Sequence, residues 1–152
     1  MDVGRYDEAI GAFKVALGDI LYPSPFLAEG NMGWAYYKSG DINTGIRHVR
    51  NAVATNPKFC RGYEWLMRIA LEQNNPDEVV LNGKRFEKYC LQDETLASAI
   101  PASYVKAMRY YLGLGYLKQG KAEEARQAFT SCADAQAENG FEKKCAQSLA
   151  GL

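Results

Sequence analysis

Apolar residues return at steps of three and four along most of this chain, and that spacing marks one face of an α-helix. In residues 4–21 the pattern is carried by Tyr6, Ala9, Ile10, Phe13 and Leu17. Turn-forming Gly, Asn, Asp and Pro residues interrupt the pattern. The predicted helices are 4–21, 26–39, 41–54, 60–72, 77–89, 103–119, 121–135 and 141–149. No segment alternates apolar and polar residues with a period of two, so we predict an all-α fold.

Two of these helices share an outline. Met32-Gly33 is followed after three residues by Tyr36 and then by a Gly-Asp break, and Leu112-Gly113 begins a similar run that ends at Gly120. A second amphipathic segment follows each break. This outline resembles the tetratricopeptide (TPR) repeat, a helix-turn-helix unit of about 34 residues.

The TPR resemblance implies a superhelical solenoid of antiparallel helix pairs, in a single domain over residues 1–152. Its parts would be a half repeat at 4–21, full repeats at 26–59, 60–93 and 102–136, and a capping helix at 141–149. A repeat cannot bury its apolar face alone. Because residues 4–21 correspond to the second helix of a repeat, we expect that an N-terminal segment is missing from this sequence.

Small residues are expected where the paired helices press together. In the first full repeat these are Gly33, Gly45 and Ala52. In the second repeat Met67 stands in place of the packing glycine, so the two helices of that repeat are expected to splay apart. Gly113-Leu114-Gly115 is interpreted as a packing feature and not as a phosphate loop, because no strand precedes it.

Composition argues against several functional classes. Lys and Arg together number 18 and Asp and Glu also number 18, so the formal net charge is zero, which is unlike a nucleic-acid binder. The chain has one histidine, His48, and no Ser-His-Asp or Cys-His set, so we predict that it is not an enzyme and uses no cofactor. The cysteines lack CxxC spacing, and no metal site is expected.

The four cysteines allow two interpretations. The start of one helix and the end of its antiparallel partner lie at the same end of a hairpin, and this favours the disulfides Cys60–Cys90 and Cys132–Cys145. Two disulfides would place the chain in an oxidising compartment. Four reduced cysteines that fill small packing positions, as in a cytosolic protein, are the alternative.

Helix A side chains line the concave face of a solenoid of this kind. The residues that we predict to form a partner-binding groove there are Asn31, Trp34, Tyr37, Lys38, Arg61, Glu64, Trp65, Arg68, Tyr110, Tyr111, Leu114 and Lys118. Leu27, Gly30 and Glu72 share the same register. Trp, Tyr and Arg dominate the energetics of many protein interfaces, so the pattern favours binding of a protein partner.

Three further sequence features point to one TPR group. They are Gly30-Asn31-Met32-Gly33-Trp34 after a Tyr-Pro break, Asn56-Pro57-Lys58-Phe59-Cys60 between repeats, and Arg85-Phe86-Glu87-Lys88-Tyr89-Cys90. Together they resemble the type IV pilus biogenesis pilotin lipoproteins, the PilF/PilW/Tgl group, and are most similar to its cysteine-bearing Tgl branch.

The resemblance implies a monomeric, non-enzymatic factor whose partner is an outer-membrane secretin subunit. It also implies lipid anchoring to the periplasmic face of the outer membrane, through a cysteine outside this sequence. Two alternatives stay open: a generic TPR scaffold or adaptor for another multiprotein complex, and a regulatory sensor whose groove binds a peptide.

Overall fold

A computed structural model describes residues 3–134, 136–137 and 140–152, and this part of the chain contains helices and no strand. The helices are α1 (Val3–Gly18), α2 (Pro25–Ser39), α3 (Ile42–Thr55), α4 (Cys60–Glu72), α5 (Pro76–Phe86), a π-helical turn η1 (Glu87–Leu91), α6 (Glu94–Ala99), α7 (Ala102–Lys118), α8 (Ala122–Thr130) and α9 (Gly140–Ala150). The chain forms two compact units, Met1–Leu66 and Met67–Leu152, and their boundary falls within α4. We describe each unit by itself.

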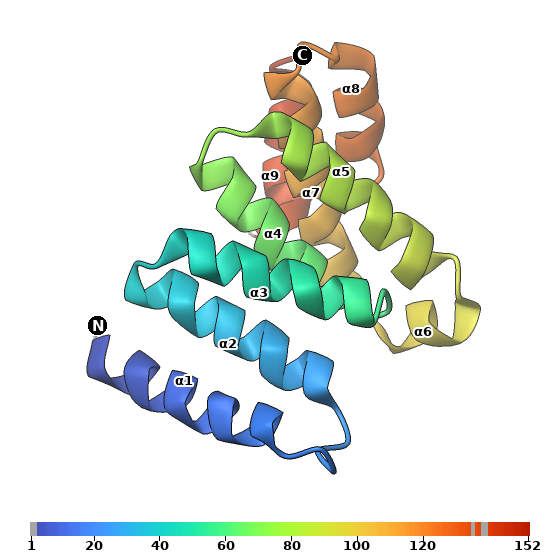
Figure 1. Cartoon of the computed structure of the whole chain (residues 1–152). Coiled ribbons are helices and arrows are strands. Elements are labelled where there is room, and N and C mark those ends of the chain that lie inside the picture. The colour runs from blue at the N-terminus through green and yellow to red at the C-terminus, as the bar shows by residue number, and fades with distance from the viewer. Residues whose placement is uncertain (1–2, 135, 138–139) are drawn as a thin grey trace. The chain divides into compact units, whose positions relative to one another are not determined.

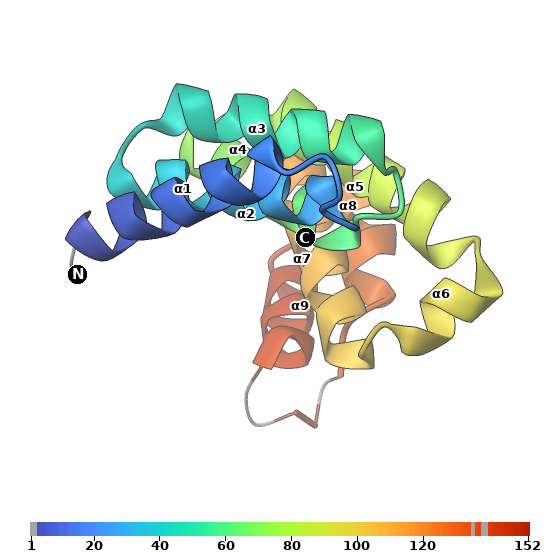
Figure 2. The same ribbon diagram turned by 60° about the horizontal axis from the view of Figure 1, so that its bottom comes forward.

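The first unit is built on the antiparallel pair of α2 and α3, and α1 packs against α2 (Figure 1). Figure 2 shows the same neighbours from a second direction. Ile10 of α1 meets Met32 and Ala35 of α2 in a buried cluster, and Tyr6 and Phe13 cover its edge. The apolar residues whose spacing marked a helix in residues 4–21 therefore form the face of α1 that packs against α2.

Two glycines set the closeness of α2 and α3. A Cβ atom at Gly33 would lie 2.8 Å from the backbone oxygen of Gly45 and 2.8 Å from the backbone nitrogen of Val49. A Cβ atom at Gly45 would lie 2.8 Å from the backbone oxygen of Gly33. The helix backbones thus touch at this crossing, as the repeat pattern predicts, and Ala52 beside them is fully buried.

Local signals explain where the helices of the first unit begin and end. The Asp41 carboxylate accepts a hydrogen bond from the Thr44 N–H at 3.2 Å, which caps the start of α3. Gly40 ends α2 in the left-handed conformation, with φ at 102°, and glycine adopts this conformation without steric cost. Pro25 begins α2 at a position where its missing N–H is not needed.

In the second unit α7 packs against α5, α8 and α9. A Cβ atom at Gly113 would lie 2.5 Å from the Phe129 ring, and one at Gly115 would lie 2.7 Å from Val79 Cγ1. Both glycines are therefore packing positions, as predicted. Gly83 of α5 has the same role against Leu112, with a notional Cβ distance of 2.8 Å, and sequence analysis did not identify it.

Besides the helix expected over 77–89, which changes to the π-helical turn η1 after Phe86, the second unit departs from the predicted boundaries at two places. The helix expected over 121–135 ends at Thr130. The Thr130 hydroxyl donates to the Arg126 carbonyl and the Ser131 hydroxyl donates to the Ala128 carbonyl, and such side-chain bonds compete with the helical ladder. Residue 135 lies outside the described residues.

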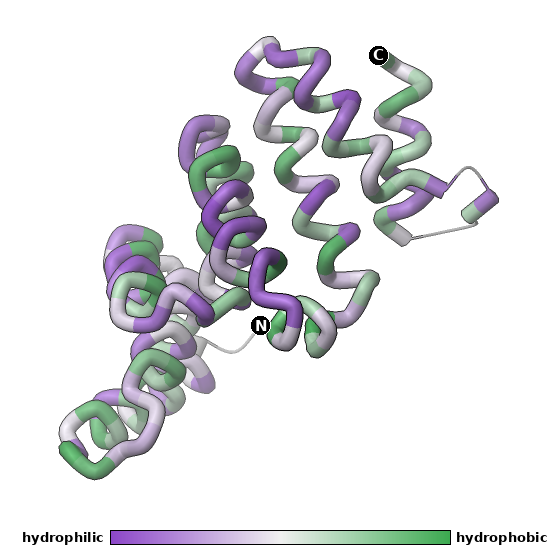
Figure 3. The backbone as a smooth tube through the Cα atoms, turned by 90° about the vertical axis from the view of Figure 1, so that its right-hand side faces the viewer, coloured by the Kyte–Doolittle hydropathy of each residue, from purple (hydrophilic) through white to green (hydrophobic). Residues whose placement is uncertain are grey.

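The second departure is the segment expected as an insertion at 93–101, which contains the short helix α6. The Asp93 carboxylate caps α6 by accepting from the Leu96 N–H at 3.0 Å. Figure 3 shows hydrophobic and hydrophilic residues mixed along the helices. No helix of the described chain is long and apolar enough to cross a membrane.

Candidate functional site

The predicted groove residues divide between the two units. Asn31, Trp34, Tyr37, Lys38, Arg61, Glu64 and Trp65 belong to the first unit, and Arg68, Tyr110, Tyr111, Leu114 and Lys118 belong to the second. The single continuous groove therefore stays a prediction.

The aromatic residues of the first unit form a continuous ladder. The Trp34 and Trp65 rings stack with centroids 5.1 Å apart and planes 13° from parallel. Tyr37 continues the ladder on one side, 5.0 Å from Trp34. Phe59 meets Trp65 edge-on at 5.8 Å, and Phe26 meets Phe59 at 5.7 Å. We call these five residues the aromatic ladder.

Helix periodicity explains why the ladder forms. Trp34 and Tyr37 are three residues apart on α2 and Trp65 is on α4, so each helix presents its ring on one face. Offset-stacked and edge-on contacts of this kind contribute about 0.5–1.5 kcal/mol per pair beyond the area they bury. The two tryptophans thus lie together, although sequence reasoning placed them only on the same face.

Phe59 is held in place by two glycines. A Cβ atom at Gly30 would lie 2.3 Å from the Phe59 ring, and one at Gly62 would lie 3.0 Å from it. The ring therefore occupies the space that side chains at these positions would fill, and Phe59 is 7% exposed. Gly30 was expected to face the groove, and that expectation is wrong because Phe59 covers it.

The ladder has a buried side and a more open side. Trp65 is only 5% exposed, so it supports its neighbours more than it offers a surface. Trp34, Tyr37 and Lys38 are half-buried. The Lys38 ammonium lies 5.2 Å from the Trp34 ring and 5.6 Å from the Tyr37 ring, which are cation–π distances. Of the remaining predicted residues, Asn31 and Glu64 are half-buried and Arg61 is exposed.

The predicted residues of the second unit are mostly engaged within it. Tyr110 and Tyr111 each lie 5.6 Å from the Phe141 ring of α9. Leu114 packs against the buried cluster around the second disulfide. The Lys118 ammonium donates to the Asn74 side chain at 2.7 Å. Arg68 is half-buried.

A hollow of about 280 Å³ in the second unit has a mixed polar lining. It is lined by Glu87, Arg109, Leu112, Tyr116, Glu124, Gln127, Ala128 and Ser131. Burial, and then the negative charges of Glu87 and Glu124, raise the pKa of Tyr116 above its usual 10.0. Tyr116 therefore stays a neutral phenol at physiological pH and can donate a hydrogen bond there.

His48 belongs to α3 and faces α2. Its Nδ1 atom is 2.9 Å from Glu29 Oε1, and its ring stacks on Tyr36 at 5.4 Å. This contact is a hydrogen bond in the tautomer that carries a proton on Nδ1, because a carboxylate oxygen accepts. Among the described residues no group of three His, Cys, Asp or Glu side chains could hold a metal ion.

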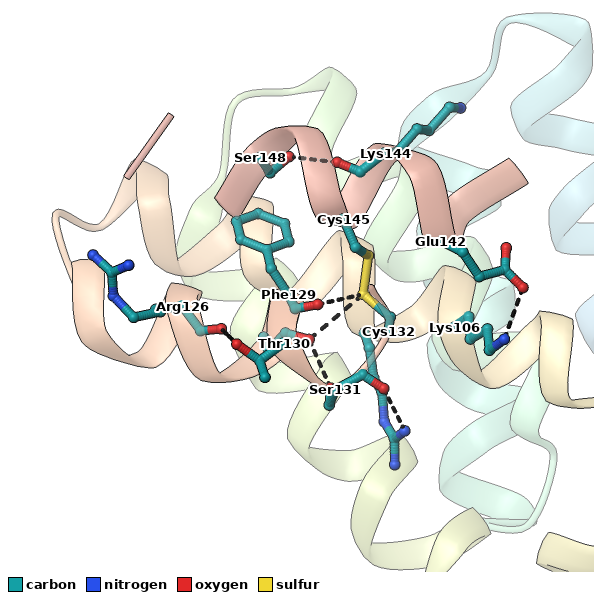
Figure 4. The surroundings of a disulfide bond; sticks show 12 residues. Lys106, Arg126, Phe129, Thr130, Ser131, Cys132, Glu142, Lys144, Cys145 and Ser148 are labelled. Carbon is teal, nitrogen blue, oxygen red and sulfur yellow. Dashed lines mark hydrogen bonds and ion pairs between the residues drawn. A yellow bond between two sulfur atoms is a disulfide. The ribbon is translucent and has the colours of Figure 1, made fainter. Parts of the chain in front are cut away.

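The cysteines are oxidised. Cys132 of the turn after α8 and Cys145 of α9 form a disulfide with Cα atoms 6.0 Å apart (Figure 4). Phe129 packs beside it, and the Lys106–Glu142 ion pair at 2.8 Å also joins α7 to α9. Cys60 and Cys90 are in the disulfide form as well. The structure therefore does not have the four reduced core cysteines of the alternative interpretation. Disulfides of this kind persist in oxidising compartments.

The class that this fold defines is the TPR-type helical solenoid, as the sequence predicts. The chain is similar to the crystal structure of PilW, a type IV pilus biogenesis factor, with a TM-score of 0.72 and 16% identity. That match covers 94% of this chain and 60% of the PilW chain, so the chain spans less than two thirds of the length of the PilW chain.

Two other solved structures share the fold. The N-terminal domain of stress-induced protein-1 from C. elegans matches with a TM-score of 0.66 and 18% identity, over 80% of this chain and 92% of that domain. MamA matches with a TM-score of 0.64 and 19% identity, over 97% of this chain and 86% of the MamA chain. No protein-family model and no curated protein matches the sequence.

Proposed function

We propose that this chain is a non-enzymatic protein–protein interaction module that acts as a pilotin-like factor. In this proposal it promotes assembly of an outer-membrane secretin during type IV pilus biogenesis. The observation that carries the interaction role is the aromatic ladder with its half-buried Trp34 and Tyr37. The likeness in fold to PilW supports the pilus context.

The ladder suits an apolar partner segment. Trp34 stacks on the buried Trp65 and Tyr37 packs against Trp34, so a partner meets rings that are already ordered. Ordered aromatic residues bind with a smaller loss of conformational entropy than mobile side chains do. An amphipathic segment of an unassembled secretin subunit could place its apolar residues on these rings, as helices do in apolar grooves.

The cysteine chemistry supports the location that the proposal needs. The oxidised cysteines fit an oxidising compartment. We place the protein at the periplasmic face of the outer membrane, where it would be held by the lipid anchor that the family resemblance implies. We also propose that the protein is a monomer and that it binds one secretin subunit at a time.

The test is a double substitution of Trp34→Ala with Tyr37→Ala. Trp65 is left in place because removing a buried tryptophan costs about 3–5 kcal/mol of stability and would confuse binding with folding. The assay is the amount of detergent-resistant secretin multimer formed when each variant is expressed with the secretin subunit of the source organism. We expect the double variant to form few multimers.

The matched control is Val15→Ser on α1, because Val15 is 77% exposed and lies outside the ladder. It should support normal multimer formation. Normal multimers in the double variant, with the fold intact by circular dichroism, would overturn the ladder as the secretin-binding site. Loss of binding to a different complex with secretin assembly unchanged would favour a generic scaffold or a peptide-binding sensor.

A further inference from the structure

We propose that the first unit carries a second binding site, for a lysine side chain of a protein partner, in a hollow at the end of the α2–α3 hairpin. The hollow has a volume of about 510 Å³, within the range of about 300–1,000 Å³ that is typical of ligand sites. Its lining residues are Leu17, Pro25, Phe26, Glu29, Asn51, Ala54 and Thr55. Phe26 is also the first residue of the aromatic ladder, and the other six lie outside it.

The lining combines apolar walls with one charge. Leu17, Pro25, Phe26 and Ala54 are apolar, and Glu29 is the only charged residue of the lining. The Glu29 side chain is 20% exposed, so it is accessible from the hollow but partly desolvated. An electrostatic contact in such a place is stronger than one at the open surface. The ligand chemistry that fits is a cation on an aliphatic stem.

The hydrogen bonds of Glu29 fix its orientation and define which cation fits. His48 Nδ1 lies 2.9 Å from Oε1, and Asn51 Nδ2 donates to the same oxygen at 3.2 Å. Among the described residues no hydrogen bond reaches the second oxygen, Oε2. One carboxylate oxygen is therefore occupied and the other is available.

This arrangement favours lysine over arginine. A guanidinium binds a carboxylate best through two parallel bonds, one to each oxygen. Because His48 and Asn51 already occupy Oε1, that geometry is blocked, while a single ammonium contact to Oε2 remains possible.

The connection between α1 and α2 explains why apolar residues should flank the lysine. Ile20 is 97% exposed and Leu21 is 83% exposed. The Asp19 carboxylate accepts a hydrogen bond from the Leu21 N–H at 2.9 Å, which holds this turn in shape. Neither Ile20 nor Leu21 lines the hollow, but the turn lies in sequence between two lining residues, Leu17 and Pro25, so exposed apolar side chains are available close by in sequence for residues that flank the lysine.

The test uses three blocked pentapeptides that differ only at the centre of acetyl-Ala-Leu-X-Leu-Ala-amide, where X is lysine, norleucine or arginine. Binding is followed by amide chemical shifts of the ¹⁵N-labelled full chain, at Leu17, Glu29 and Thr55. We expect the lysine peptide to bind with a dissociation constant of about 1 mM. The norleucine peptide should bind about tenfold more weakly, because it lacks a charge-assisted hydrogen bond. The arginine peptide should bind more weakly than the lysine peptide.

Two variants distinguish the contribution of the Glu29 carboxylate to peptide binding from the contribution of the shape of the hollow. Glu29→Gln keeps an oxygen that can accept from Asn51 but removes the charge, and it should abolish the difference between lysine and norleucine peptides. Ala54→Leu fills the hollow without touching Glu29 and should weaken all three peptides. Glu8→Gln, at an exposed position on α1, is the matched control and should behave as wild type.

Equal binding of the lysine and norleucine peptides to the wild-type chain would overturn the proposal. So would the absence of shifts at the lining residues up to about 10 mM peptide, or full discrimination in Glu29→Gln. The Trp34→Ala/Tyr37→Ala variant should still bind the lysine peptide. The lysine site and the proposed secretin role can therefore fail independently.

Discussion

Adding one methyl group at Gly33 should destabilise the first unit, whereas the same change at Gly11 should stabilise it. Both glycines lie inside helices, α2 and α1 respectively. At Gly33 a Cβ atom would come within 2.8 Å of backbone atoms of Gly45 and Val49. At Gly11 it would meet nothing within 4 Å.

The magnitudes follow from two opposing effects. Alanine is favoured over glycine in a helix interior by about 1 kcal/mol, and this gain applies to both sites. At Gly33 the methyl group also overpacks the crossing of α2 and α3, which costs about 1–3 kcal/mol. The cost belongs near the top of that range, because helix backbone cannot turn aside as a flexible side chain can. We expect Gly33→Ala to destabilise the chain by about 2 kcal/mol and Gly11→Ala to stabilise it by about 0.5–1 kcal/mol.

The assay is urea denaturation followed by circular dichroism, with thermal unfolding as a second readout. For a chain of this length 1 kcal/mol corresponds to a shift of about 2–4 °C in Tm. Gly33→Ala should therefore unfold at lower urea and lower temperature than wild type, and Gly11→Ala at higher. Equal midpoints for the two variants would refute the claim that the backbones touch at Gly33.

Two further predictions concern the second unit. Because the Cys132–Cys145 disulfide closes a short loop, with a sequence separation of 13, replacing both cysteines with alanine should destabilise this unit by about 3 kcal/mol; a urea midpoint unchanged from wild type would contradict that. The hydrogen bond from Lys106 lowers the pKa of Glu142 below its usual 4.5. The stabilising effect of this pair should be fully present above pH 4.5 and should be lost as the pH falls through the lowered pKa, since the unfolded state then gains the proton first. In Lys106→Met the Glu142 pKa measured by NMR should rise toward its usual value, and an unchanged pKa would show that the ion pair is not formed in solution.

The sequence predicted the helices and their glycine contacts because both depend on local chemistry. Periodicity and turn residues placed α2, α3 and α4 within one residue of their observed bounds. Gly33 and Gly113 could be assigned to packing because a repeat unit fixes which residues of its two helices meet. This information is contained in a window of about 34 residues.

The candidate binding features depend on contacts between repeats, and these contacts were only partly predictable. Trp34 and Trp65 could be placed on one face, but their stacking could not be derived from spacing. The role of Phe59 was missed because it lies in the turn between two helices, outside either periodic pattern. Its place after Asn56-Pro57 was the available signal. The end of α8 was missed because hydroxyl side chains bond to their own helix carbonyls there, which periodicity does not reveal.

The aromatic ladder and the glycines beneath it make one physical unit. Gly30 and Gly62 have no side chains, so Phe59 can enter the space between their helices and meet both Trp65 and Phe26. Larger residues at either glycine would expel that ring and remove the support of the stacked tryptophans. The binding proposed at Trp34 and the packing at Gly30 should therefore be coupled, although Gly30 is buried. A change that leaves the surface of the ladder intact should in this way still alter the binding that we propose for the ladder.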